Sequence, residues 1–402
     1  MVGADNREFR TMAALMDGHQ QVARGCWNVT TNRNGYAGLD GASSGGAGAI
    51  AANRNASTLV VGDLVVQEDF CNLACDYCRG NVIEGRSGER RARLSVKEGR
   101  RLLDRIKSCA NPLVLKLSGG ELSCLVGECL PLCIQASATF PRVQILTNGV
   151  DFRPHWIDEL NARANVFFQF SLDGHTLPMN AHRFSRRSVL TRIIDAMKRA
   201  SALNPIEVNA VVTRDNAAGL VEFSSFLADV VPRATLYPFP VRGRPDLFPE
   251  AAPLERLLDA VQFSPAMRSV LPPLGYLRSL VDFIRAGVRQ RRCYVPLFVR
   301  GFFATGDVQM CPCEDLGSVG DLWSGYNEDR LQGAAIKKFC VASDIDPKCR
   351  QCFTHYEVLN LAFEFHELIP VSPPVPLFVG LEGAISSLMV ETRNRVDAAN
   401  CR

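Results

Sequence analysis

The sequence predicts an α/β fold in which a partial (β/α)6 barrel is followed by a small cysteine-rich domain. Between residues 58 and 240, short runs that are apolar on both faces alternate about six times with stretches of helical periodicity. Gly-Gly, Asn-Gly and Asp-Gly pairs follow three of the apolar runs. A second group of cysteines begins at Cys293, beyond the last predicted strand. Strands of this kind indicate a parallel sheet whose faces are both covered.

The predicted elements follow one another regularly. Ser95 is a candidate N-cap of the first helix, Ser188 opens the fourth helix, and Pro131 interrupts the second. In a barrel of the TIM type, active residues lie at the carboxyl ends of the strands. The strands are predicted at 57–67, 112–118, 142–147, 165–173, 205–213 and 233–239, and the helices at 95–109, 125–138, 155–163, 188–203 and 217–231.

Composition and charge limit the classes of function. The chain has 402 residues, 47% of them hydrophobic and 22% charged, with a formal net charge of +3. This near-neutral charge argues against a nucleic-acid partner, and the sequence has no apolar run long enough to span a membrane. The start does not resemble a secretory signal, so we expect a cytoplasmic protein. Its 15 cysteines are then expected to be thiols or metal ligands rather than disulfides.

Changes in composition divide the chain into five expected segments. Residues 1–57, rich in Gly, Ala, Asn and Ser, are expected to form a disordered extension. Residues 58–240 form the barrel core. A Pro-rich link with two predicted helices occupies 241–292, the cysteine-rich domain occupies 293–360, and a C-terminal tail occupies 361–402.

Three cysteines lie within eight residues in the segment FCNLACDYCRG. Cys71, Cys75 and Cys78 follow the first predicted strand and precede the first predicted helix. Thiolates bind soft metals or iron–sulfur clusters, and clusters normally take four of them. A loop that offers three would leave one iron open to the amino and carboxylate groups of a small molecule. The alternative is a zinc knuckle with a distant fourth ligand.

Polar motifs end the next three strands. In SGGE, residues 118–121, the glycines permit close backbone approach to a ligand, and the carboxylate can accept hydrogen bonds from an ammonium group. TNG, residues 147–149, and SLDG, residues 171–174, end the third and fourth strands. Each motif taken singly could be a turn. Their order at successive strand ends indicates one binding site.

The C-x3-C-x2-C loop, with a tyrosine before its last cysteine, and these strand-end motifs resemble the radical S-adenosylmethionine (SAM) superfamily. The resemblance covers roughly residues 60–240. It implies a [4Fe–4S] cluster on Cys71, Cys75 and Cys78, with SAM at the fourth position. It also implies reductive cleavage of SAM to a 5′-deoxyadenosyl radical that abstracts a substrate hydrogen. The residues implied to seat SAM are Tyr77, Ser118, Gly119, Gly120, Glu121, Thr147, Asn148, Ser171, Asp173 and Arg183.

The second cysteine group suits a closed site for zinc or an iron–sulfur cluster. Cys293 and Cys311 have the spacing C-x12-G-x4-C, and Cys349 and Cys352 form CRQC. Residues 298–311 predict a β-hairpin whose open end would bring Cys293 and Cys311 together.

This pattern resembles the first half of the SPASM extension of the same superfamily. The further cysteines of a full extension are absent from the sequence, so the segment resembles the shorter twitch domain, with one auxiliary [4Fe–4S] cluster. A site with one open iron and a zinc site remain alternatives. Cys313, in CPC, could replace Cys311 as a ligand or donate a hydrogen atom to the substrate. His175 and His182 flank SLDG and are weaker catalytic candidates.

The resemblance implies radical chemistry, but leaves the substrate open. The first hypothesis is modification of a ribosomally made peptide by crosslinking, thioether formation or epimerisation. The second is a twitch-type dehydrogenase or related enzyme acting on an aminocyclitol, a sugar or another small natural-product intermediate. The third is a non-catalytic iron–sulfur or zinc scaffold. The expected partners are a reductant such as flavodoxin or ferredoxin and a separate peptide-recognition protein, because residues 1–57 are too glycine-rich to form one.

Overall fold

The computed structural model describes residues 59–67, 70–78, 94–125, 127–313, 316–365 and 375–400. The prediction of disorder for residues 1–57 therefore lies outside the described residues.

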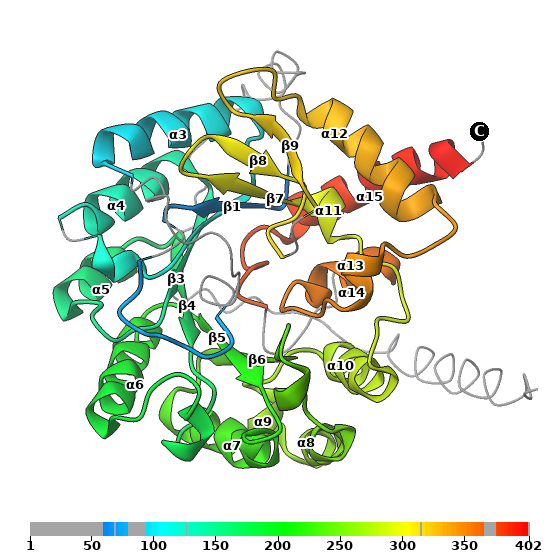
Figure 1. Ribbon diagram of the computed structural model, residues 1–402. Helices are drawn as coiled ribbons and strands as arrows, with labels where there is room; N and C mark the ends of the chain where they lie inside the picture. Colours follow the sequence, from blue (N-terminus) through cyan, green and yellow to red (C-terminus); the bar gives the residue numbers. More distant parts are fainter. Residues whose placement is uncertain are drawn as a thin grey trace, which may run out of the picture. The chain divides into compact units, whose positions relative to one another are not determined.

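Six parallel strands form the main sheet, in the spatial order of the sequence (Figure 1). Each strand is almost completely buried on both faces, as the apolar runs predicted. The prediction of a partial (β/α)6 barrel is thereby confirmed. The strands are β1 (Val61–Val65), β2 (Val114–Ser118), β3 (Arg142–Thr147), β4 (Val166–Ser171), β5 (Ile206–Val212) and β6 (Ala234–Pro240).

Five helices connect these strands and lie around them (Figure 1). The predicted N-cap Ser95 is confirmed and is part of a capping box, because the Ser95 side chain accepts from Glu98 N and the Glu98 side chain accepts from Ser95 N. The helices are α3 (Val96–Cys109), α4 (Cys129–Thr139), α5 (Pro154–Asn161), α6 (Arg187–Ser201) and α7 (Leu220–Val230), and single 3₁₀ turns occupy Leu122–Cys124, Pro178–Asn180, Ala217–Gly219 and Pro245–Leu247.

Two predicted helix features are wrong. Helix α6 begins at Arg187, so Ser188 lies inside its first turn and caps nothing. Helix α4 begins only at Cys129, which places Pro131 at its third residue. A proline there is tolerated, because the first N–H groups of a helix have no partner within the helix. Pro131 therefore does not interrupt α4.

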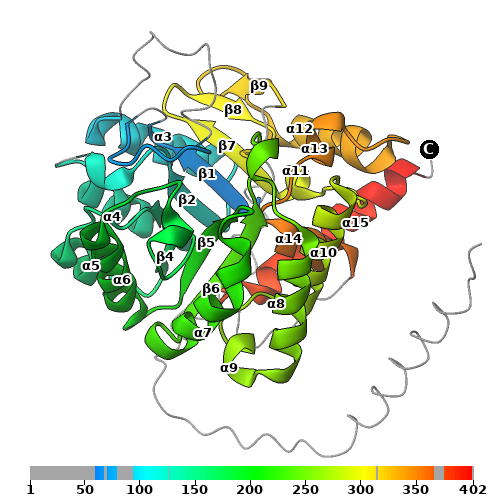
Figure 2. The same cartoon turned by 60° about the horizontal axis from the view of Figure 1, so that its bottom comes forward.

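An antiparallel extension continues the sheet on the β1 side (Figure 2). Strand β7 (Val299–Phe303) pairs with β1 in parallel, and β8 (Asp307–Gln309) and β9 (Ser318–Asp321) follow antiparallel. The pairing of Phe302 with Val308 confirms the predicted hairpin. The C-terminal cysteine-rich segment is therefore built directly onto the barrel sheet.

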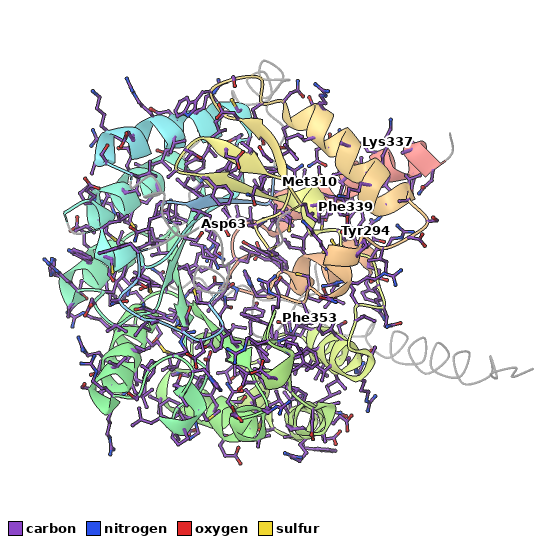
Figure 3. The ribbon with its side chains drawn as sticks, viewed as in Figure 1. Asp63, Tyr294, Met310, Lys337, Phe339 and Phe353 are labelled. Atoms are coloured by element: carbon purple, nitrogen blue, oxygen red, sulfur yellow. The ribbon has the colours of Figure 1, made fainter. Side chains whose placement is uncertain are left out.

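Helices fill the other side, beyond β6. After the barrel come α8 (Ala251–Phe263), α9 (Pro265–Arg268) and α10 (Leu274–Ala286). Helix α14 contacts both α10 and α11 (Figure 1). Figure 3 labels Phe353, whose ring lies 5.4 Å from that of Phe283 in α10. The remaining elements are α11 (Val295–Phe298), α12 (Glu328–Ala335), a π-helical turn (Ile336–Val341), α13 (Pro347–Arg350), α14 (Glu357–Glu364) and α15 (Glu382–Asn400).

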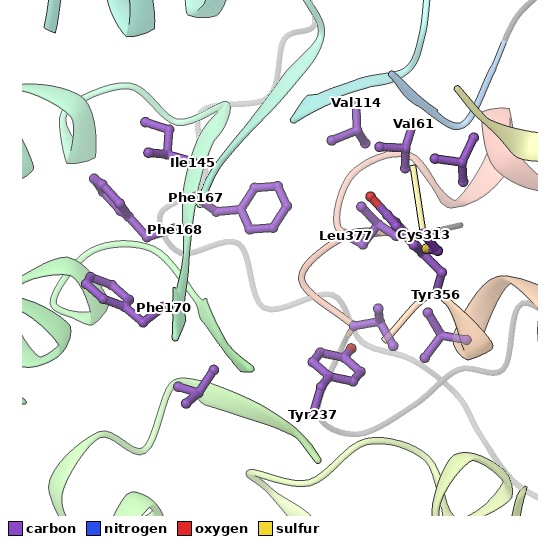
Figure 4. Close-up of a cluster of buried hydrophobic side chains, with 14 of the residues drawn as sticks. Val61, Val114, Ile145, Phe167, Phe168, Phe170, Tyr237, Cys313, Tyr356 and Leu377 are labelled. Carbon is purple, nitrogen blue, oxygen red and sulfur yellow. The ribbon is translucent and has the colours of Figure 1, made fainter. Parts of the chain in front are cut away.

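A layer of buried polar side chains lies below the carboxyl ends of the strands. Glu207 on β5 accepts hydrogen bonds from Gln144 on β3, at 2.6 Å, and from Gln169 on β4, at 2.7 Å. Lys116 on β2 lies 3.8 Å from the Asp63 carboxylate on β1. Every strand from β1 to β5 thus contributes one polar residue. Figure 4 shows the apolar part of the same interior, with Phe167 facing Leu377 and with Tyr356 beside Cys313.

No helix within the described ranges is both long and apolar enough to cross a bilayer. The segment boundaries at 57, 240, 292 and 360 remain predictions.

Candidate active site

A pocket of about 750 Å³ opens at the carboxyl ends of the barrel strands. Its volume is in the usual range for small-molecule sites. Its wall includes all three cysteines of the loop and most of the residues expected to seat SAM. These are Cys71, Cys75, Cys78, Tyr77, Gly119, Gly120, Glu121, Thr147, Asn148, Ser171 and Arg183.

Ser118 and Asp173 do not line this pocket. The Ser118 hydroxyl donates to Asp63 inside the barrel, and the Asp173 carboxylate is buried behind the cysteine loop. Their contacts are therefore with protein groups, and their predicted roles toward SAM remain untested.

A buried trio fastens the cysteine loop to the barrel. The Tyr77 hydroxyl donates to Asp173 Oδ2, Arg183 Nη1 lies 3.7 Å from Asp173 Oδ1, and Val211 N donates to Asp173 Oδ1 over 2.9 Å. Burial raises the pKa of the Asp173 carboxyl, and the charge of Arg183 opposes the rise. Asp173 thus joins the loop to the ends of β4 and β5.

A second set of contacts holds the outer side of the same loop. Asp76 N donates to His182 O over 2.9 Å, and the His182 ring lies between the carboxylates of Asp76 and Asp215, at 3.1 and 2.8 Å. Burial lowers the pKa of His182, but its hydrogen bonds to Asp215 and Asp76 outweigh this and raise it. His182 does not line the pocket. We interpret it as a residue that positions the loop rather than a catalytic one.

The glycines of SGGE are needed where β2 meets the segment before the loop. A Cβ on Gly119 would lie 2.3 Å from Gln67 O, and one on Gly120 would lie 2.2 Å from Phe70 O. Gly119 also has a φ of +139°, which other residues rarely adopt. Only glycine permits the two backbone segments to approach this closely.

The Glu121 carboxylate makes internal hydrogen bonds. It accepts from Thr147 Oγ1 at 2.7 Å, from Asn148 N at 2.6 Å and from both N and Oγ of Ser123. Burial raises the pKa of Glu121, and these hydrogen bonds oppose the rise. Glu121 therefore ties SGGE to TNG, in addition to any role toward an ammonium group.

Asn148 and Asn72 connect TNG to the cysteine loop. Asn148 Nδ2 donates to Asn72 Oδ1 over 2.6 Å and approaches Cys71 Sγ at 3.7 Å. Leu73 N also donates to Cys71 Sγ, over 3.4 Å. Donors directed at a cysteine sulfur are typical of the surroundings of an iron–sulfur cluster.

Five cysteines from the C-terminal region surround a second, small cavity. Cys293, Cys311, Cys349 and Cys352, the predicted set, line it together with Cys313. Asn360 Nδ2 donates to Cys293 Sγ over 3.8 Å, Cys313 N donates to Cys311 Sγ over 3.4 Å, and Arg242 Nη1 donates to Cys352 Sγ over 3.5 Å.

Cys313 itself belongs to this second site and not to the pocket wall. Its sulfur lies 3.7 Å from Thr354 Oγ1, and a hydrogen bond with Cys311 raises the pKa of its thiol. Both Cys311 and Cys313 lie at the second cavity, so exchange of Cys311 for Cys313 as a ligand stays an alternative. The hydrogen-donor role of Cys313 stays a prediction.

The first cysteine group has the chemistry that a cluster requires. Burial raises the pKa of Cys75 to about 11 and also raises that of Cys71, so their thiolates need the positive charge of bound iron. Arg183 also lines the pocket, although its Nε atom is buried and has no hydrogen-bond partner among the described residues.

Four cysteine thiolates suit either zinc or an iron–sulfur cluster. Zinc therefore stays an alternative for the second site, and the auxiliary cluster belongs to the proposed function.

Several pocket residues were not predicted. Asn209 and Val211 on β5, and Arg242, Lys348 and Gln351, line the same wall as the cysteine loop. Two of them could have been found from the sequence. Asn209 is a polar residue in the otherwise apolar second half of β5, and Arg242 lies just past the end of β6, where barrel enzymes place active residues. Lys348 and Gln351 come from the second cysteine segment, and no local pattern places that segment beside the pocket.

Comparisons with known proteins agree with this geometry. The sequence model of the radical SAM superfamily matches residues 68–226. The mycofactocin maturase MftC of Mycobacterium tuberculosis is 25% identical over 256 residues, which are 60% of this chain and 62% of the maturase. The chain thus spans less than two thirds of that relative. Neomycin C epimerase of Streptomyces fradiae is 30% identical over 135 residues, 33% of this chain and 40% of the epimerase.

Solved structures share the fold. SuiB of Streptococcus suis bound to S-adenosylmethionine has a TM-score of 0.53 at 17% identity, covering 71% of this chain and 70% of SuiB. The protein anSMEcpe with bound AdoMet has a TM-score of 0.53 at 14% identity, covering 85% of this chain and 99% of that one. Residues 68–226 of this chain thus match the radical SAM superfamily, and the fold is that of solved radical SAM structures.

Proposed function

We propose that this radical SAM enzyme modifies a ribosomally made peptide by crosslinking, thioether formation or epimerisation. The observation that carries the proposal is the similarity to a mycofactocin maturase over 256 residues. The fold is also that of SuiB solved with its precursor peptide SuiA, with a TM-score of 0.51.

In this proposal, two clusters and SAM are held by the two cysteine groups and the pocket wall. Cys71, Cys75 and Cys78 would hold one cluster, and Cys293, Cys311, Cys349 and Cys352 an auxiliary cluster. Gly119, Gly120 and Asn148 would form the SAM seat, and Arg183, which lines the same pocket, would pair with the SAM carboxylate. With its cluster and SAM bound, the family's chemistry is the reductive cleavage of SAM and the removal of a substrate hydrogen.

The chain's own residues hold these parts in position. Asp173, Tyr77 and Arg183 fix the loop against β4 and β5, and Glu121 fixes the SGGE segment against TNG. Lys348 and Gln351 place the second cysteine segment in the pocket wall. A substrate in this pocket would therefore lie between the two cysteine groups.

A second candidate is an enzyme acting on an aminoglycoside or a related small molecule. The 30% identity to neomycin C epimerase supports it, although the match covers only 33% of this chain. An epimerisation needs a hydrogen donor, and an oxidation needs an electron acceptor.

The test measures 5′-deoxyadenosine from anaerobically reconstituted enzyme with SAM and dithionite. We expect slow background formation that rises when a precursor peptide is added, chosen from any short reading frames that neighbour this gene, together with a mass change in that peptide. A rise with neomycin-type aminoglycosides and none with the peptide would support the second candidate instead. Absence of any 5′-deoxyadenosine would support a non-catalytic scaffold.

A further inference from the structure

Arg242 lies between the pocket and the second cysteine site. It lies just past the end of β6, separated from Pro240 by Val241, at the carboxyl end of the barrel, and it lines the pocket. The pocket wall continues from it to Lys348 and Gln351, which flank Cys349 and Cys352 in sequence. One residue therefore borders both sites.

One guanidinium nitrogen of Arg242 connects two separate cysteine segments. Nη1 donates to the carbonyl oxygen of Cys313 over 2.6 Å and to Cys352 Sγ over 3.5 Å. Two other predicted ligand sulfurs of this site have uncharged donors. The Asn360 amide donates to Cys293 Sγ, and the backbone N–H of Cys313 donates to Cys311 Sγ. Arg242 thus brings a permanent positive charge to a predicted ligand sulfur.

Arg289 provides an internal comparison. It is also buried beside this site, but it donates to the carbonyl oxygen of Cys352, over 2.9 and 3.1 Å, and pairs with Glu357 at 2.7 Å. It does not line the pocket. Arg242, in contrast, both donates to a cysteine sulfur and lines the pocket.

We propose that Arg242 is a positioning residue that raises the reduction potential of the auxiliary cluster from the pocket side, through its hydrogen bond to Cys352 Sγ. Hydrogen bonds to ligand sulfurs and nearby positive charge stabilise the more negative, reduced state of a cluster. An auxiliary cluster beside the substrate would then accept an electron more readily. The proposal rests on the proposed auxiliary cluster.

The experiment uses the full chain carrying Cys71, Cys75 and Cys78→Ala, so that only the auxiliary cluster remains. In this background we would compare Arg242→Gln, Arg242→Lys and the control Arg292→Gln. Arg292 is adjacent to Cys293 in sequence, and its side chain donates to the carbonyl oxygens of Phe339 and Ser343. The readouts are iron per chain and a redox titration followed by electron paramagnetic resonance.

We expect Arg242→Gln to keep its iron and to shift the midpoint potential to a more negative value. Arg242→Lys should shift it less, because lysine keeps the charge but not the geometry of the guanidinium, and Arg292→Gln should leave it unchanged. An unchanged potential in an iron-loaded Arg242→Gln would overturn the proposal. Equal shifts of the potential in Arg242→Gln and Arg292→Gln would also overturn it. They would show that any nearby positive charge has the same effect, without a hydrogen bond to Cys352 Sγ.

If Arg242→Gln loses its iron, its midpoint potential cannot be measured, and the iron content and potential of Arg242→Lys test the proposal instead. An iron-loaded lysine variant with a shifted potential supports the proposal, and one with an unshifted potential overturns it. Loss of iron from both would show that Arg242 only builds the site, which also overturns it. Absence of iron from the background protein itself would contradict the auxiliary cluster in the proposed function, and the Arg242 proposal with it.

Discussion

The Tyr77 hydroxyl fastens the cysteine loop to the barrel at a single buried point. Its acceptor, Asp173, is 1% exposed and also receives Val211 N and the charge of Arg183. A hydroxyl that donates to a buried carboxylate is costly to remove, because the carboxylate is left partly unsatisfied. The tyrosine before the last cysteine thus has a structural role that can be tested separately from any contact with SAM.

We predict that Tyr77→Phe loosens the loop without unfolding the barrel. Loss of one hydrogen bond to a buried charged group costs about 1–3 kcal/mol. This should speed the loss of the cluster on Cys71, Cys75 and Cys78 to a chelator by roughly fivefold or more, as measured by bleaching of its visible absorption.

The matched control is Tyr326→Phe, since the Tyr326 hydroxyl also donates to a carboxylate, that of buried Glu328, away from the pocket. We expect it to lower the free energy of unfolding by a similar amount and to leave the bleaching rate of the first cluster unchanged. Equal bleaching rates for wild type and Tyr77→Phe would show that Tyr77 does not hold the loop.

At the scale of elements, the ends of β1 and β2 form a close backbone junction below the cysteine loop. Gly120 N donates to Gln67 O over 2.8 Å, and Glu121 N donates to Phe70 O over 3.0 Å. Gln67 Nε2 in turn donates to Glu121 O over 2.6 Å. These bonds set the point at which the loop leaves the sheet.

Gly120→Ala should therefore disrupt the first cluster site. The new Cβ would meet a backbone oxygen at 2.2 Å, and the backbone must shift to relieve the contact. We expect less than half of the wild-type iron on the first cysteine group and weaker SAM binding in equilibrium dialysis.

Gly127→Ala is the control in the same connection between β2 and α4. Gly127 has a φ of +83° but no atom within 4 Å of an added Cβ, so this variant adds backbone strain of about 1–2 kcal/mol without a clash. It should keep its iron. Equal iron loss in both variants would attribute the effect to general destabilisation.

Most of the elements could be predicted from the sequence, because strands buried on both faces and amphipathic helices have strong local patterns. The hairpin of β7 and β8 was predicted from the Thr-Gly-Asp turn between its strands. The start of α6 was not, since Arg186 simply leads into the helix in an extended conformation and no side chain caps it.

The predicted site residues could be identified as a group, but not their contacts. Glu121 carried the signal of an ammonium acceptor, yet its carboxylate bonds to Thr147 and Asn148, which lie 26 and 27 residues away on another strand end. Lys348 reaches the pocket only through the packing of the C-terminal segment. Such long-range contacts depend on the complete fold and leave no local pattern.

At the scale of the whole molecule, the polar layer inside the barrel contains a carboxyl group with a strongly altered pKa. Burial raises the pKa of Glu207 from its usual 4.5 to about 7, although Gln169, Lys116 and Arg142 oppose the rise. A raised pKa means that the folded protein binds a proton more tightly than the unfolded chain. The free energy of unfolding should therefore fall as the pH rises from about 4.5 to about 7, and this contribution should be constant above that range.

Glu207→Gln should remove this pH dependence. The amide oxygen can accept the hydrogen bonds from Gln144 and Gln169, whereas the Leu377 backbone N–H, which also bonds to the Glu207 carboxylate, would face the amide NH2 group. A pKa rise of this size corresponds to about 3 kcal/mol. We predict that the stability of the variant relative to wild type rises by up to about that amount between pH 4.5 and pH 8.

Urea unfolding of both proteins across this pH range measures the difference. Because the other titrating groups are common to both proteins, they cancel in the comparison. A stability difference that does not change with pH would contradict the proposed titration of Glu207.

The central claim for the whole molecule is that two separate cysteine groups each hold a four-iron cluster on one barrel. The first group lies at the end of β1, and the second is built onto the same sheet through β7 and closed by α13 and α14. Donors directed at sulfur accompany both groups.

The most direct test is an iron and sulfide count on anaerobically reconstituted protein, comparing wild type with the Cys71, Cys75 and Cys78→Ala triple variant. Two clusters predict about eight irons per chain in the wild type and about four in the triple variant. About four irons falling to none would contradict the account, because the second cysteine group would then hold no cluster.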